Sequence, residues 1–176
     1  MILFSPSATR APLMRVSAAS GTAIPVPQQG LPLDGYTSPQ FLPDGRFLFH
    51  MRGGSDVRGI YLGALDGRAP IRLVVSAVGG AYLPAHALAA GATTTSAGGP
   101  PSAEASRDGG WLLWLRPDTV TLVAQRLDLS TATLVGEPVT VVAEGVAVDD
   151  RFSSPAVSVA TAGFLAYRGG AGGCGS

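Results

Sequence analysis

Lysine is absent from this chain of 176 residues, and cysteine and histidine are rare. All 12 basic residues are arginines, and they balance 12 acidic residues, so the formal net charge is zero. A neutral chain gives no electrostatic reason to expect nucleic acid or an anionic membrane surface as a partner. The single cysteine, Cys174, cannot form an internal disulfide and therefore says little about the cellular compartment.

Long apolar runs and catalytic motifs are missing as well. No uncharged apolar run reaches the roughly 18 residues that a membrane span needs. The opening residues, MILFSPSATR, lack the basic and apolar regions of a signal peptide. We find no Gly-rich phosphate loop, His-Arg-Asp or Asp-Phe-Gly motif of kinases, and no Gly-x-Ser-x-Gly elbow of hydrolases. The sequence therefore predicts a non-enzymatic chain without a cofactor or a metal.

Glycine and proline are abundant instead. The chain has 24 Gly and 14 Pro, is 46% hydrophobic and is only 14% charged. This composition is typical of an all-β chain with frequent turns.

The stretch SPQFLPDGRFLFH, residues 38–50, shows how the turns divide the strands. Pro43, Asp44 and Gly45 predict a tight turn, because Pro fixes φ, Asp bonds its own backbone and Gly accepts positive φ. The strand RFLFHM follows, then IYLGAL, a second corner with Asp66 and Gly67, and the strand IRLVV. Four strands in about 38 residues form a meander of the length of one propeller blade.

Apolar strand starts recur along the chain. ILF begins at residue 2, FLF at 47, LLW at 112 and FLAY at 164, with separations of 45, 65 and 52 residues. The long separation contains residues 86–110, which are rich in Ala, Gly, Ser, Thr and Pro and predict a flexible insertion. Without about 20 inserted residues the spacing fits the 40 to 50 residues of a blade.

Four segments resemble a known family. PQFLPDGRFLF, GIYLGALDG, GEPVTVVAEGV and FLAYRGG are similar to the TolB-type β-propeller repeats at the C-terminal end of bacterial serine/threonine protein kinases. The resemblance implies a partial propeller of about three to four four-stranded antiparallel blades. The expected blades are residues 1–34, 35–80, 81–148 with the insertion 86–110, and an incomplete 149–170, followed by a Gly-rich tail at 171–176.

The resemblance implies a non-catalytic binding or sensor module, expected to be a fragment of a larger bacterial protein such as a receptor-type kinase. The alternatives are a periplasmic TolB-like interaction module and the propeller part of a prolyl-oligopeptidase-type hydrolase without its catalytic domain. The partner, a protein or a small ligand, stays open. Since few blades leave open faces, the missing blades or a second copy are expected partners. A receptor kinase would place the chain outside the cytoplasm.

Few residues are candidates for chemistry. His50 and His86 have no metal-ligand or acid-base partners at a fixed spacing, which favours structural roles. The cluster Asp149-Asp150-Arg151 suggests a cation site, or more simply an exposed loop between blades. Trp111 and Trp114 are three residues apart, so on a strand they face opposite sides of the sheet.

Overall fold

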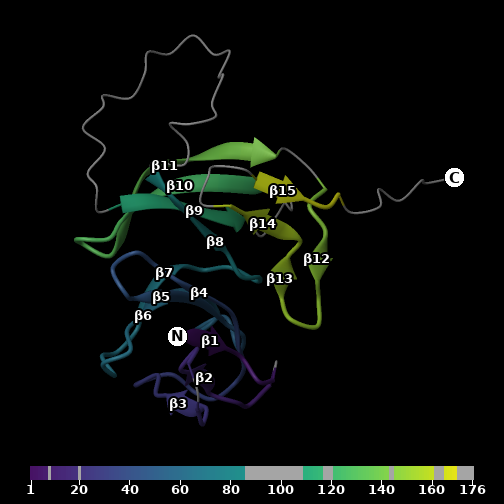
Figure 1. Cartoon of the computed structure of the whole chain (residues 1–176). Helices are drawn as coiled ribbons and strands as arrows, with labels where there is room; N and C mark the ends of the chain where they lie inside the picture. Colours follow the sequence, from purple (N-terminus) through teal and green to yellow (C-terminus); the bar gives the residue numbers. More distant parts are fainter. Residues whose placement is uncertain are drawn as a thin grey trace, which may run out of the picture.

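The computed structural model describes residues 1–7, 9–19, 21–85, 109–116, 121–142, 145–160 and 165–169. These residues form antiparallel strands in five sheets, as Figure 1 shows. The prediction of an all-β fold is confirmed, and the expectation of four strands per sheet holds for two of the five sheets. Within these ranges, nothing helical is long and apolar enough to cross a bilayer.

The two larger sheets are meanders in which each strand pairs antiparallel with the next. One sheet contains β4 (Tyr36–Phe41), β5 (Phe47–Met51), β6 (Gly59–Gly63) and β7 (Ile71–Val74). The other contains β8 (Ala81–Pro84), β9 (Gly109–Leu115), β10 (Leu122–Asp128) and β11 (Thr133–Val142). The strand order in each sheet therefore follows the chain, with β4 and β8 at one edge and β7 and β11 at the other.

Three smaller sheets accompany them. A three-stranded sheet at the start of the chain contains β1 (Ile2–Phe4), β2 (Leu13–Val16) and β3 (Ile24–Val26). Two hairpins follow β11, one of β12 (Val148–Asp149) with β13 (Ser154–Pro155) and one of β14 (Val157–Val159) with β15 (Leu165–Tyr167). Figure 1 shows sheet β8–β11 above sheet β4–β7, sheet β1–β3 below it, and the two hairpins at the side.

Alternation along β5 explains why the sheets stack. Phe47 and Phe49 face sheet β1–β3, whereas Leu48, between them, faces sheet β8–β11. All five residues of β5 are buried, because this strand has a neighbouring sheet on both faces. The same holds for β6, where Tyr61 lies in one core and Ile60 in the other.

Each core lies between sheets that are consecutive in the chain. The first core joins sheets β1–β3 and β4–β7 and contains Leu13, Val26, Tyr36, Phe47, Phe49, Met51 and Tyr61. The second joins the two larger sheets and includes Leu48, Ile60, Leu62, Tyr82, Leu112, Trp114, Val123 and Leu127. The third joins sheet β8–β11 to the hairpins and contains Leu83, Leu113, Leu115, Leu122, Ala124 and Val146.

The tryptophans of β9 follow the same alternation. Trp114 is buried in the second core, and Trp111 packs partly buried against the third. The prediction that they face opposite sides is confirmed. The indole N–H of Trp114 is buried and has no hydrogen-bond partner in the described part of the chain.

The expected insertion at 86–110 lies outside the described residues except for its last two. The structure assigns Gly109 and Gly110 to β9, where they pair with Asp128 and Leu127 of β10. Gly110 is required by packing, because a Cβ there would collide with the ring of Tyr82. His86 and the tail at 171–176 also lie outside the described residues.

Candidate binding hollow

The first strands of the two larger sheets, β4 and β8, are joined by hydrogen bonds from one side chain. Gln40 of β4 donates from Nε2 to the carbonyl of Tyr82 in β8 at 3.1 Å, and its Oε1 accepts the Tyr82 N–H at 2.7 Å. The amide thus takes the place of a strand neighbour on the edge of β8. This contact brings the edges of β4 and β8 together, and β14 also contacts β8.

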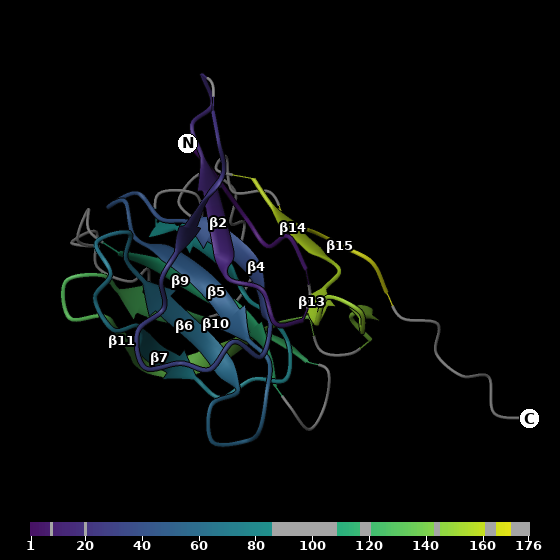
Figure 2. The same cartoon turned by 90° about the horizontal axis from the view of Figure 1, so that it is seen from below.

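An open hollow of about 810 Å³ lies beside β4. It is lined by Leu3, Phe4, Ser5, Ser38, Pro39, Asp149, Phe152, Ser154, Pro155, Ala156 and Arg168. The lining therefore comes from β1 and the residue after it, from β4, from the segment between β12 and β14, and from Arg168 after β15. Both cartoon views place β13 and β14 on the β4 side of the stack, with β6 and β7 farther away (Figure 2). The hollow is wide open to solvent and is not an enclosed cavity.

The hollow runs along the edge of β1. Leu3 and Phe4 are consecutive in the strand, so their side chains point to opposite faces of the sheet, yet both line the hollow. In the described part of the chain, β1 has a hydrogen-bonded strand neighbour only on the β2 side. Away from β2, β1 contacts β4, and the Ser5 hydroxyl donates to the Tyr36 carbonyl.

Another side of the hollow is formed by the turn between β12 and β13, which side-chain hydrogen bonds stabilise. The Asp149 carboxylate accepts the backbone N–H of Arg151 at 2.9 Å and that of Phe152 at 3.2 Å. The Arg151 guanidinium lies 5.4 Å from the centre of the Phe152 ring, which is a cation–π contact. Asp149 thus supports the turn that presents Phe152 to the hollow. No group of three or more metal-ligating side chains occurs in the described residues.

His50 is buried on β5 and does not belong to the lining. Its Nε2 lies 3.2 Å from the carbonyl of Ser76, which can only accept, so Nε2 carries the proton and Nδ1 accepts from the Thr37 hydroxyl at 3.2 Å. Burial lowers the pKa of His50 to about 4, with smaller contributions from the charges of Arg52 and Arg58. The imidazole is therefore neutral at pH 7 and joins β4 to the segment after β7.

The corner predicted at residues 43–45 lies between β4 and β5. Gly45 has φ of 83°, and its N–H bonds the Leu42 carbonyl at 3.1 Å. The Asp44 carboxylate accepts the Arg46 N–H at 3.0 Å and forms an ion pair with the Arg46 guanidinium at 2.6 Å. Pro43 also lines a second hollow of about 270 Å³ between β4, β8 and the end of β14.

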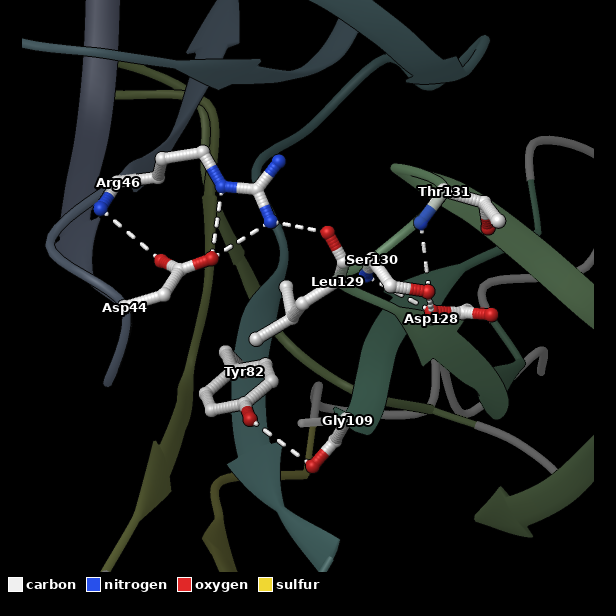
Figure 3. Close-up of polar contacts among 8 residues, drawn as sticks. All are labelled: Asp44, Arg46, Tyr82, Gly109, Asp128, Leu129, Ser130 and Thr131. Carbon is white, nitrogen blue, oxygen red and sulfur yellow. Dashed lines mark hydrogen bonds and ion pairs between the residues drawn. The ribbon is translucent and has the colours of Figure 1, made fainter. Parts of the chain in front are cut away.

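The side chain of Arg46 connects this corner to the neighbouring sheet β8–β11. Its guanidinium donates to the carbonyl of Leu129, in the turn after β10, as Figure 3 shows. In that turn, hydrogen bonds from Ser130 and Thr131 lower the pKa of the Asp128 carboxyl. Nearby, the Tyr82 hydroxyl donates to the Gly109 carbonyl at 3.2 Å, and burial raises the pKa of Tyr82.

The second predicted corner lies between β6 and β7. Asp66 accepts the Arg68 N–H at 3.1 Å and pairs with its guanidinium at 2.8 Å, and Gly67 has φ of 82°. Neither corner contributes a charged group to the larger hollow.

Sequence reasoning singled out one residue of the lining, Asp149, and missed the others. Phe152 lies in no quoted motif, Arg168 lies in FLAYRGG without being a site candidate, and the two come together only through the packing of segments distant in sequence. The repeated Ser-Pro pairs at 5–6, 38–39 and 154–155 were an available signal, because each places a residue in the hollow. No protein-family model, curated protein or solved structure matches this chain.

Proposed function

We propose that this chain is a non-catalytic binding module built as part of a β-propeller, with its sheets acting as blades. The observation that carries the proposal is the packing of consecutive sheets. Both larger sheets are four-stranded meanders that bury both faces, each against the sheet before and the sheet after it in the chain. Blades of a propeller pack in this nearest-neighbour manner.

The position of the hollow supports a binding role. It lies where β1, β4 and the β12–β14 segment approach one another, on the side of the first strands β4 and β8. In a propeller the first strands of the blades surround the central channel, which is a usual ligand site. In this proposal the larger hollow belongs to that channel.

The chemistry of the lining favours binding over catalysis. Its ionisable side chains are Asp149, which supports a turn, and Arg168. Three serines line the hollow, but His50 is engaged elsewhere by Thr37 and Ser76. The lining thus offers hydroxyls and apolar surface, and within the described residues no histidine lies among them.

The TolB-type resemblance extends the proposal to the parent protein. We infer a sensor region of a larger bacterial protein, such as a receptor-type serine/threonine kinase, placed outside the cytoplasm. A periplasmic TolB-like interaction module and the propeller of a prolyl-oligopeptidase-type hydrolase are the alternatives. Further blades or a second copy would cover the open outer sheets.

Thermal unfolding with a ligand panel tests the binding role. Short peptides and small polar molecules are added to the 176-residue chain, and a ligand of the hollow raises the melting temperature. Phe152→Asp should remove that shift, whereas Val139→Asp, on an exposed strand far along the chain, should keep it. Turnover of ATP, ester or peptide substrates that is lost in the hollow variant would contradict the non-catalytic role. A panel without any shift would contradict the binding role.

A further inference from the structure

His50 lies in the seam between the two larger sheets, at the end where the chain crosses from one sheet to the other. Its ladder partners are Thr37 in β4 and Ile60 in β6, and paired residues share a face of the sheet. Ile60 belongs to the second core, so the imidazole points into the same seam. Residues 75–80, the connector between β7 and β8, close the seam here, because Nε2–H of His50 donates to the Ser76 carbonyl at 3.2 Å.

The connector also touches two segments that line the larger hollow. The Gly79 N–H donates at 2.7 Å to the carbonyl of Ser153, which follows Phe152 in the turn between β12 and β13. A Cβ at Gly79 would lie 2.7 Å from the Ser38 Oγ and 3.6 Å from the Cβ of His50. Both Ser38 and Phe152 line the hollow. The connector therefore contacts His50 as well as two sides of the hollow.

A second proton on His50 meets no favourable partner in the seam. Nδ1 accepts from the Thr37 hydroxyl at 3.2 Å, and a proton on Nδ1 would remove that acceptor. The side chain is 1% exposed, and the charges that act on it, those of Arg52 and Arg58, are both positive. Arg52 is held in place because its guanidinium donates to the Arg151 carbonyl at 2.9 Å.

The other titratable groups around the imidazole provide no counter-charge. Burial raises the pKa of three tyrosines on the adjoining strands, which are therefore neutral at acid pH: Tyr36, Tyr61 and Tyr82. The connector contains no titratable side chain. The acidic residues of the surrounding loops are all exposed to solvent: Asp34, Asp56, Asp149 and Asp150. A positive charge on the imidazole thus has to be stabilised by water.

The connector is the segment that can admit this water. Strands β4 and β6 are fixed beside His50 because they pair with β5 on both sides. The connector belongs to no strand, and its residues Val75 and Ala77 are exposed. Local opening occurs where few backbone hydrogen bonds have to break. Outward movement of the connector lets water reach the imidazolium while the ladder of β5 stays intact.

We propose that His50 is a pH-sensitive switch: at acid pH its protonation moves the connector away from Ser153 and changes the shape of the larger hollow. The inference goes beyond the proposed binding function, because the change of shape occurs with or without a ligand. The pKa of His50 is lowered from 6.5 to about 4 in the closed state. The equilibrium constant for opening should therefore rise by up to about tenfold for each pH unit of acidification in this range.

Amide exchange measured by NMR on the full chain tests the switch. As the pH falls from 7 to 4, exchange of the Gly79 amide should become faster relative to the same amide in His50→Gln, and the Phe152 amide should follow. Comparison at equal pH cancels the intrinsic pH dependence of exchange and any response of Asp149, which both proteins retain. Low urea should not accelerate the Gly79 exchange, because a local opening exposes little surface. Paired amides of β9 and β10 should exchange more slowly and with a urea dependence.

A second variant tests the hydrogen bond that favours the neutral ring. Thr37→Val should shift the acid response of Gly79 to higher pH by roughly 0.5 to 1 pH unit. The matched control Thr140→Val, at an exposed position of β11, should leave the response in place.

Three outcomes would overturn the switch. One is an acid response that persists in His50→Gln, and another is a response that Thr37→Val does not shift. The third is exchange of Gly79 with the rate and urea dependence of β9 and β10, which would show that acid acts only through unfolding of the whole chain. No ligand takes part in these measurements, so their failure leaves the proposed binding function in place.

Discussion

Sheet β4–β7 contains the tripeptide Asp-Gly-Arg at two corners. The two corners have the same local geometry, but their side chains differ in exposure and in their contacts with the neighbouring sheet. Gly45 and Gly67 have φ of 83° and 82°, and both arginines pair with the preceding aspartate. In the first corner, the Arg46 and Asp44 side chains are 28% and 32% exposed. In the second, the Arg68 and Asp66 side chains are 83% and 49% exposed.

The difference arises from the neighbouring sheet. The first corner joins β4 to β5, and Arg46 reaches the Leu129 carbonyl of sheet β8–β11. The second corner joins β6 to β7 at the outer side of the sheet, where Ile71 is about half exposed. The sequence of a corner thus determines its turn, and the tertiary environment determines how much its side chains stabilise the fold.

The largest expected difference in the free energy of unfolding is between a substitution in the buried strand β5 and one in the outer strand β7. Phe49→Ala should lower the free energy of unfolding by about 3 to 5 kcal/mol, because a buried phenyl ring leaves a cavity. Its ring lies in the first core against Tyr36 and Tyr61, with centroids 5.5 Å away in both cases. Ile71→Ala on β7 should cost less than about 1 kcal/mol. Urea denaturation measures both, and equal losses would break the comparison.

The pH dependence of stability should also come from the buried half. The pKa of His50 is lowered to about 4 in the folded chain, against an ordinary value of 6.5. The unfolded chain therefore binds a proton first, and stability falls as the pH drops from about 6.5 to about 4. The loss from this group is on the order of 3 kcal/mol. Below pH 4 both states are protonated, and His50 contributes no further change.

His50→Gln should flatten the stability profile over this pH range, even if it lowers stability at pH 7. The unaltered protein, titrated alongside, gives the reference slope. Urea titrations at pH 4, 5, 6 and 7 measure the slope. A slope that His50→Gln leaves intact would assign the acid response to other groups.

Substitutions of the two glycines test the positive φ angle that both corners share. Gly45→Val should destabilise the protein by about 1 to 3 kcal/mol, because a β-branched residue resists positive φ. Gly67→Val should cost the same, since the φ values match and an added Cβ meets no atom closer than 3.8 Å at either position. A loss at Gly45 alone would show that the outer corner unfolds separately from the rest of the sheet. An unchanged denaturation midpoint for Gly45→Val would contradict the turn geometry.

Substitutions of the two arginines test the contact with the neighbouring sheet, which only the first corner makes. Their expected effect on the free energy of unfolding is the smallest. Arg46→Ala removes a charge-assisted hydrogen bond to the neighbouring sheet and should cost about 1 to 2 kcal/mol. Arg68→Ala removes an exposed ion pair and should stay within about 0.5 kcal/mol. Thermal unfolding at low and high salt compares them. Equal costs would mean that the contact with Leu129 adds no stability.

Local patterns in the sequence were sufficient to locate β5, β6 and β7 of the first large sheet. The apolar run in RFLFHM, bounded by Gly and Pro, corresponds to β5, because a strand with a sheet on each face needs apolar residues throughout. The spacing of Trp111 and Trp114 likewise predicted that they face opposite sides of the sheet, and in the structure they pack in two different cores. These features depend on residues close together in the chain.

Contacts between distant segments could not be predicted in the same way. The hollow brings Leu3 beside Phe152 and Arg168, and no local pattern encodes that proximity. The reach of Arg46 to Leu129 has the same origin, since Arg68 has the same local sequence and lacks this contact with the next sheet. In the described residues, four positive φ angles occur at residues other than glycine, at Arg10, Ser38, Ala132 and Ser153, and no local pattern predicts them.

The order of the cores along the chain has a consequence for synthesis. Each larger sheet is continuous in sequence apart from its connecting segments, and each packs on the sheet that was made just before it. A chain that leaves the ribosome from its amino end can therefore dock one sheet after another, without waiting for residues far downstream. Assembly would be vectorial, and the most recently made sheet would at each moment present its unfilled face to the next.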